Sequence, residues 1–141
     1  MLRGIPEIIA PDLMSAMMNM GHGDEILLAD GNFPAASHAR RLIRCDGCSV
    51  AQLLEAIVPF FPLDHTVEKP AAVMSIRDDE DIPAAWHAYS DIMEQSASGF
   101  GGFEQVERFA FYDRAKLAYA IVITGDKAYK GNLILKKGSV R

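Results

Sequence analysis

The residues best suited to chemistry lie within residues 20–34, which read MGHGDEILLADGNFP. His22 stands between two glycines, and an imidazole can give or take a proton near neutral pH. The flanking glycines let the backbone adopt unusual dihedral angles and approach a ligand closely. Asp24, Glu25 or Asp30 could orient the imidazole, so this stretch indicates acid–base catalysis. The alternative is an ordinary turn histidine beside solvated acids.

A second group of candidate residues lies in the C-terminal third of the chain. Residues 108–115 read RFAFYDRA and contain both Arg108 and Tyr112. Aromatic faces stack on the apolar faces of sugars, and a guanidinium donates to hydroxyls. Gly131 and Asn132 could present an amide to a hydroxyl, although glycine and asparagine are also common turn residues. Residues 108–115 could equally be the start of a helix with a surface ion pair.

Composition limits the function classes that this chain can serve. Its 141 residues are half apolar and carry a net charge of -5. This size predicts one domain, 1–141, and the composition argues against disorder. The weak negative charge argues against nucleic acid as a partner. We expect no membrane partner and a cytoplasmic protein, because no apolar run approaches about 18 residues and the start lacks a signal-peptide pattern.

Metal or redox chemistry is a weaker interpretation. Cys45 and Cys48 form one CxxC, whereas structural zinc needs four ligands, so two incidental thiols are favoured. No His-x-His or HExxH spacing surrounds His22. His38, in a predicted polar loop, is interpreted as an ordinary histidine, and so are the other two histidines. We therefore expect no metal and no cofactor.

Hydrophobic patterns predict the elements that must position these residues. Helices are expected over 11–20, 49–60, 81–97 and 111–117, and strands over 25–29, 42–45, 71–76, 106–109, 118–125 and 133–136, with a Gly/Ser loop over 96–102. Strands that read as continuous apolar runs between helices indicate an α/β three-layer sandwich, with a mostly parallel central sheet and helices on both faces. Ligands bind at the carboxyl ends of such strands. This places Asp30 at the expected site, and the loops around His22 and Asn132 are considered with it.

Ordered similarities along essentially the whole chain indicate a family. They cover residues 11–13, 20–26, 29–30, 32–34, 44, 46–47, 53–57, 62–64, 108–109, 111–112, 114–115, 123–125 and 131–138. These stretches resemble the RbsD/FucU family of sugar mutarotases. The GHGDE form, rather than the GHTD of ribose pyranases, and Arg108 are similar to the branch that acts on L-fucose.

The resemblance implies an RbsD-like fold and an isomerase that interconverts sugar anomers by opening and closing the ring. No metal, nucleotide or electron carrier is required. It implies His22 as the proton donor and Asp30 and Arg108 as sugar-binding residues. Gly131 and Asn132 carry over as binding residues, with Tyr112 nearby. The alternatives are a ribose-type pyranase and a non-catalytic sugar-binding protein on the same fold.

One departure from the family pattern precedes the last strand. The family has Tyr-Gly-Asn there, whereas this chain has Tyr129, Lys130, Gly131 and Asn132. Either Tyr129 reaches the sugar through a changed turn, or Lys130 takes over the contact. Family members form symmetric rings, typically decamers, with sites near subunit contacts. The resemblance therefore implies a homo-oligomer whose sites combine residues of two chains.

Overall fold

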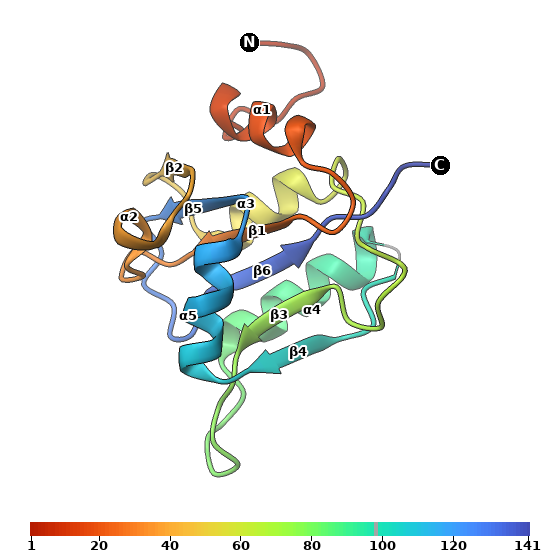
Figure 1. Cartoon of the computed structure of the whole chain (residues 1–141). Coiled ribbons are helices and arrows are strands. Elements are labelled where there is room, and N and C mark those ends of the chain that lie inside the picture. Colours follow the sequence, from red (N-terminus) through yellow and green to blue (C-terminus); the bar gives the residue numbers. More distant parts are fainter. Residues whose placement is uncertain (98) are drawn as a thin grey trace.

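The computed structural model describes residues 1–97 and 99–141, so Ser98 of the predicted Gly/Ser loop lies outside the described residues. Its centre is a six-stranded sheet with the strand order β2-β5-β1-β6-β3-β4 (Figure 1). The strands are β1 (Glu25–Ala29), β2 (Leu42–Cys45), β3 (Ala71–Met74), β4 (Phe103–Val106), β5 (Ala120–Thr124) and β6 (Leu133–Lys136). β1 to β5 share one direction, and β6 runs antiparallel to its neighbours β1 and β3. The prediction of a mostly parallel central sheet is confirmed.

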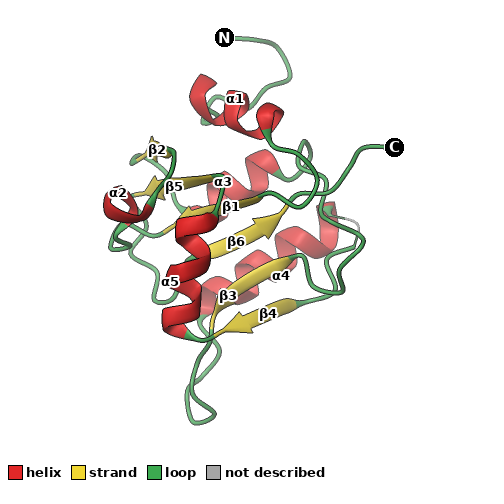
Figure 2. Ribbon diagram, in the orientation of Figure 1, coloured by secondary structure: helices red, strands yellow, loops and turns green. Residues whose placement is uncertain are grey.

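Helices cover both faces of the sheet, as predicted (Figure 2). α1 (Pro11–Asn19), α3 (Val50–Ile57) and α4 (Ala84–Ser96) pack on one face, and α2 (Ala35–His38) and α5 (Arg108–Leu117) pack on the other. Successive side chains of a strand point to opposite faces. Accordingly Ile26 and Leu28 of β1 join the first cluster, and Leu27 and Ala29 join the second. Both faces of β1 are buried, which explains its continuous apolar sequence.

Side-chain caps mark the starts of α3 and α5. Ser49 and Gln52 form the capping box that the sequence predicts for α3. At α5 the prediction is wrong: β4 ends at Val106, so no strand covers 106–109, and the helix begins at Arg108 rather than at residue 111. The physical reason is that the Glu107 carboxylate accepts from the Ala110 N–H at 3.0 Å and so caps the first turn. This places Arg108 on a helix.

The ends of the strands form two opposite edges of the sheet. The carboxyl ends of β1 to β5 and the start of β6 lie at one edge, which we call the carboxyl edge, and the opposite ends form the amino edge. Glu25 pairs with Lys136 at the amino edge, and Leu28 pairs with Leu133 near the carboxyl edge. The five residues of β1 span about 16 Å. His22, before β1, and Asp30, after it, therefore lie at opposite edges.

Within the described residues, no helix combines the length and apolar character that a membrane span requires.

Candidate functional site

His22 lies at the amino edge beside a buried carboxylate. Its Nε2 is 2.9 Å from Oδ1 of Asp64, a side chain that is 4% exposed, whereas the His22 side chain is 43% exposed. The backbone N–H and hydroxyl of Thr66 donate to the same oxygen at 2.9 and 2.7 Å. These bonds, followed by the His22 contact, hold the pKa of Asp64 well below its usual range. Asp64 is therefore ionised at neutral pH and fixes the imidazole.

This pairing selects the nitrogen that can react. An ionised carboxylate is an acceptor only, so Nε2 of His22 must donate to Asp64. Nδ1 has no hydrogen bond to any described residue, and it is the atom that can exchange a proton with a ligand. The ring of His65 stacks beside that of His22, with centroids 6.4 Å apart and planes 13° apart. His65, interpreted from sequence as ordinary, is thus a neighbour of the reactive ring.

The sequence assigned the wrong orienting acid to His22. Asp24 accepts from the Gly21 N–H at 2.7 Å, Glu25 is paired with Arg114 at 2.6 Å, and Asp30 lies at the other edge. Asp64 stands 42 positions away from His22, and only its place in the family-like stretch 62–64 could have indicated a role. The expected freedom of the flanking glycines holds for Gly23, which has φ +88°.

The carboxyl edge brings together Asp30 and Asn132, whereas the loop of His22, which the sequence grouped with that of Asn132, lies at the amino edge. Both are buried, and the Asp30 N–H donates to Oδ1 of Asn132 at 2.9 Å. Oδ1 of Asp30 accepts from the Asn32 N–H at 2.9 Å. Burial raises the pKa of Asp30, and the nearby charge of Asp126 adds to this effect. A buried carboxylate of this kind suits a hydroxyl ligand and can accept a proton.

Aromatic side chains lie close together near Asp30, beginning with Phe33. The Tyr112 ring lies 5.5 Å from that of Phe33 and 5.6 Å from that of His38, centroid to centroid. The Arg108 guanidinium lies 5.9 Å from the centre of the Tyr112 ring. His38 is the last residue of the short helix α2, so it does not lie in the predicted polar loop. Arg108 and Tyr112 thus belong to the carboxyl edge and not to the surroundings of His22.

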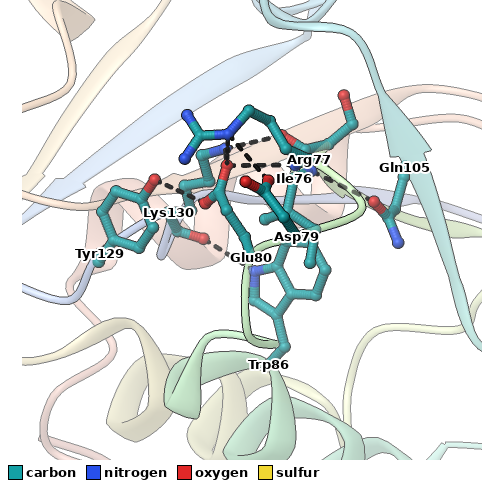
Figure 3. Close-up of polar contacts among 9 residues, drawn as sticks. Ile76, Arg77, Asp79, Glu80, Trp86, Gln105, Tyr129 and Lys130 are labelled. Carbon is teal, nitrogen blue, oxygen red and sulfur yellow. Dashed lines mark hydrogen bonds and ion pairs between the residues drawn. The ribbon is translucent and has the colours of Figure 1, made fainter.

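The turn before β6 is held by side chains that the sequence did not single out (Figure 3). The Trp86 indole donates to the carbonyl of Lys130 at 3.0 Å, and the Tyr89 hydroxyl donates to that of Gly131 at 2.7 Å. The Tyr129 hydroxyl donates to Glu80 at 2.9 Å. Neither Tyr129 nor Lys130 forms a side-chain hydrogen bond with Asp30 or Asn132.

The two cysteines are free thiols at the end of β2 and in the turn after it. Cys48 donates to the Cys45 carbonyl at 3.2 Å. Burial raises the pKa of Cys45 to about 11, so this thiol is protonated at neutral pH and is a poor nucleophile. Among residues 1–97 and 99–141, no three His, Cys, Asp or Glu side chains are arranged to hold a metal ion.

Comparisons with known proteins agree along the whole chain. The model of the RbsD / FucU transport protein family matches residues 3–140. L-fucose mutarotase of Glaesserella parasuis serovar 5 is 48% identical over 139 residues, which cover 98% of this chain and 95% of that protein. Fucose mutarotase of Homo sapiens is 45% identical and covers 97% of this chain and 93% of that protein.

Solved structures give the same result for the fold. The crystal structure of the fucose mutarotase in complex with L-fucose from Streptococcus pneumoniae has a TM-score of 0.94 and 44% identity, and covers 99% of this chain and 100% of that one. Bacillus subtilis RbsD complexed with D-ribose has a TM-score of 0.72 at 20% identity, covering 94% of this chain and 95% of that one, which supports the fold alone.

Proposed function

Because this chain belongs to the RbsD / FucU transport protein family, we propose that it is a sugar mutarotase, an isomerase that interconverts the α and β anomers of L-fucose. Relatives named L-fucose mutarotase share nearly half of its residues over almost the full length. The structure with bound L-fucose superposes on it over 99% of the chain. The observation within this molecule that carries the proposal is the exposed imidazole of His22, held by an ionised, buried Asp64.

The reaction needs two proton transfers and no change in oxidation state. The bond between the anomeric carbon and the ring oxygen breaks, the ring oxygen gains a proton, and the anomeric hydroxyl loses one. Rotation of the open aldehyde and closure on its other face give the second anomer. As the imidazolium, His22 keeps the Nε2 proton on Asp64 and can give its Nδ1 proton to the ring oxygen, and the Asp30 carboxylate, with its raised pKa, is suited to take the other proton; ring closure returns both protons.

One sugar cannot contact both groups within one chain. His22 and Asp30 lie at opposite edges of the sheet, separated by the roughly 16 Å length of β1, which exceeds the size of a monosaccharide. We infer that each site combines His22 and Asp64 of one chain with the carboxyl edge of its neighbour. Such a site requires a homo-oligomer, and a ring such as a decamer would repeat the same contact between successive chains.

The carboxyl edge supplies the sugar contacts in this proposal. Asp30, Arg108 and Asn132 bind hydroxyls, and Tyr112 packs against the apolar face of the ring. Gly131 presents its backbone beside Asn132. Tyr129 and Lys130 contribute by fixing the turn, since their polar atoms contact Glu80 and Ser75. The cytoplasm is the proposed compartment.

Saturation-transfer NMR on an equilibrium mixture of L-fucose anomers tests the function. The wild type should accelerate exchange, His22→Ala should abolish the acceleration, and His87→Ala, an exposed histidine on α4, should retain it. Faster exchange of ribose than of fucose would favour the pyranase alternative. Binding of L-fucose without accelerated exchange would make the chain a sugar-binding protein and reject the mutarotase.

A further inference from the structure

Lys130 has a strained backbone. Its φ of +49° is the only positive value at a non-glycine position among residues 1–97 and 99–141. In this left-handed region the Cβ atom crowds the following carbonyl, and lysine lacks the short polar side chain that makes asparagine and aspartate tolerant of it. Such a conformation persists only where neighbouring groups determine it. The neighbours of Lys130 therefore carry the explanation.

Three contacts hold Lys130 in this conformation (Figure 3). Its Nζ donates to the Ser75 carbonyl at 2.8 Å and lies 3.6 Å from Oε1 of Glu80. Its own carbonyl accepts from the Trp86 indole at 3.0 Å. The ammonium is also 5.5 Å from the centre of the Tyr129 ring, whose hydroxyl donates to Oε2 of Glu80. Both side chains that precede Gly131 thus converge on one carboxylate.

Glu80 is well placed to act as this anchor. Its side chain is 11% exposed, and the Arg77 N–H donates to it at 3.1 Å. This bond, together with the Tyr129 hydroxyl, holds the pKa of Glu80 below its usual range. The carboxylate is therefore charged at neutral pH and fixed to the β3–α4 connection. We name the group of Glu80, Tyr129 and Lys130 the clasp.

The clasp is connected to the site by two residues. Gly131 is packed so closely that an added Cβ would lie 3.1–3.2 Å from Ala128 and from the Tyr89 hydroxyl. Gly131 therefore has little free space beside it, and it is followed directly by Asn132, whose Oδ1 accepts from the Asp30 N–H. A change in the backbone of Lys130 would alter the position of the Asn132 amide relative to Asp30.

We propose that Glu80 is a positioning residue for the sugar site, which through Tyr129 and Lys130 holds the left-handed turn that sets Asn132 against Asp30. The inference rests on the proposed function, because it assigns Asn132 and Asp30 to the sugar. If the turn leaves this conformation for about nine-tenths of the time, the apparent affinity for sugar falls roughly tenfold. Saturating sugar restores the competent state, so KM rises and kcat changes little.

Two substitutions of Lys130 separate conformation from contact. Lys130→Ala and Lys130→Gly both remove the ammonium, but only glycine adopts positive φ without steric cost. Lys130→Ala should raise KM and the calorimetric Kd for L-fucose roughly tenfold, whereas Lys130→Gly should keep both within about threefold of wild type. An equal loss in the two variants would mean that the ammonium contacts the sugar directly. No loss in either would mean that the clasp has no role, and both results overturn the proposal.

A second pair of variants tests Glu80 itself. Glu80→Gln preserves the shape of the side chain but removes its charge, and it should raise KM and Kd with little change in kcat. Adding Lys130→Gly to Glu80→Gln should bring both constants back toward wild type, because the turn then no longer needs the clasp. Asp79→Asn, on an exposed side chain of the same connection, is the matched control and should leave both unchanged.

The two proposals fail in different ways. The mutarotase proposal is rejected if the wild type does not accelerate anomer exchange. The positioning proposal is tested separately, by comparing the Kd for L-fucose of Lys130→Ala with that of Lys130→Gly. A Glu80→Gln variant that binds L-fucose as tightly as the wild type would reject the positioning role, whatever the exchange rate of the wild type.

Discussion

Mixing two inactive variants should restore activity if each site combines two chains. His22→Ala removes the proton donor from the amino edge, and Asp30→Asn removes the carboxylate from the carboxyl edge. Each variant alone should be close to inactive. In a co-expressed mixture, a site is complete only where an Asp30→Asn chain provides His22 and a His22→Ala chain provides Asp30.

The expected magnitude follows from the geometry. With equal amounts and random assembly, each of the two required choices has a chance of about one half, so about a quarter of wild-type activity should return. If both groups served one site within a chain, no chain in the mixture would hold both, and activity would stay at the level of the single variants. The assay is anomer exchange of L-fucose by saturation-transfer NMR on the purified mixture.

A second mixture is the control. His22 and Asp64 contact each other within one chain at 2.9 Å, so a single chain supplies both residues to a site. Co-expressed His22→Ala and Asp64→Asn should show no more activity than Asp64→Asn alone, since every chain lacks one member of the pair. Recovery in this control, or no recovery with Asp30→Asn while the mixed oligomer is demonstrably present, would refute the two-chain site.

Three further predictions concern single positions. Asp64→Asn should lower kcat about ten- to a hundredfold with a smaller change in KM, because a neutral amide orients the imidazole of His22 less firmly; an unchanged kcat would contradict this. Arg114→Met should lower the free energy of unfolding, measured in urea, by about 1–3 kcal/mol, because it leaves the largely buried Glu25 unpaired. Arg44→Met is the control: it breaks an exposed ion pair with Asp46 and should cause no measurable loss of stability. Asp30→Asn should raise Tm at neutral pH. The pKa of Asp30 is raised in the folded chain, so the folded chain binds more protons than the unfolded one, and the contribution of Asp30 to stability falls as pH rises above its pKa in the unfolded chain. The gain in Tm of Asp30→Asn should therefore disappear in acid. A difference in Tm that does not depend on pH would refute this prediction.

Much of the fold could be predicted from local patterns in the sequence. The apolar run of β1 is continuous because both of its faces are buried, and the capping box at Ser49 marks the start of α3 correctly. The start of α5 was predicted wrongly, because Val106 and Phe109 resemble strand residues, whereas the carboxylate of Glu107 caps a helix. Strand and helix propensities over a few residues do not take into account the single hydrogen bond from the Ala110 N–H to Glu107.

The candidate site was only partly predictable. The strand-end argument placed Asp30 at one edge, and the structure brings Asn132 beside it because both residues flank neighbouring strands there. It did not separate them from His22, although a five-residue strand stands between His22 and Asp30. The contacts that Tyr129 and Lys130 make with Glu80 could not be predicted, because Glu80 lies about fifty positions away in the sequence.

The sequence by itself determined which side chains are available and which strands are buried, because residue types and hydrophobic periodicity are local properties. Only the tertiary structure decided that Asp64 holds His22, that Glu80 contacts the turn before β6, and that His22 and Asp30 lie at opposite edges of the sheet. The physical reason is that hydrogen bonds and ion pairs act over about 3 Å in space, and the folding of the sheet brings together groups that the chain separates by more than forty residues.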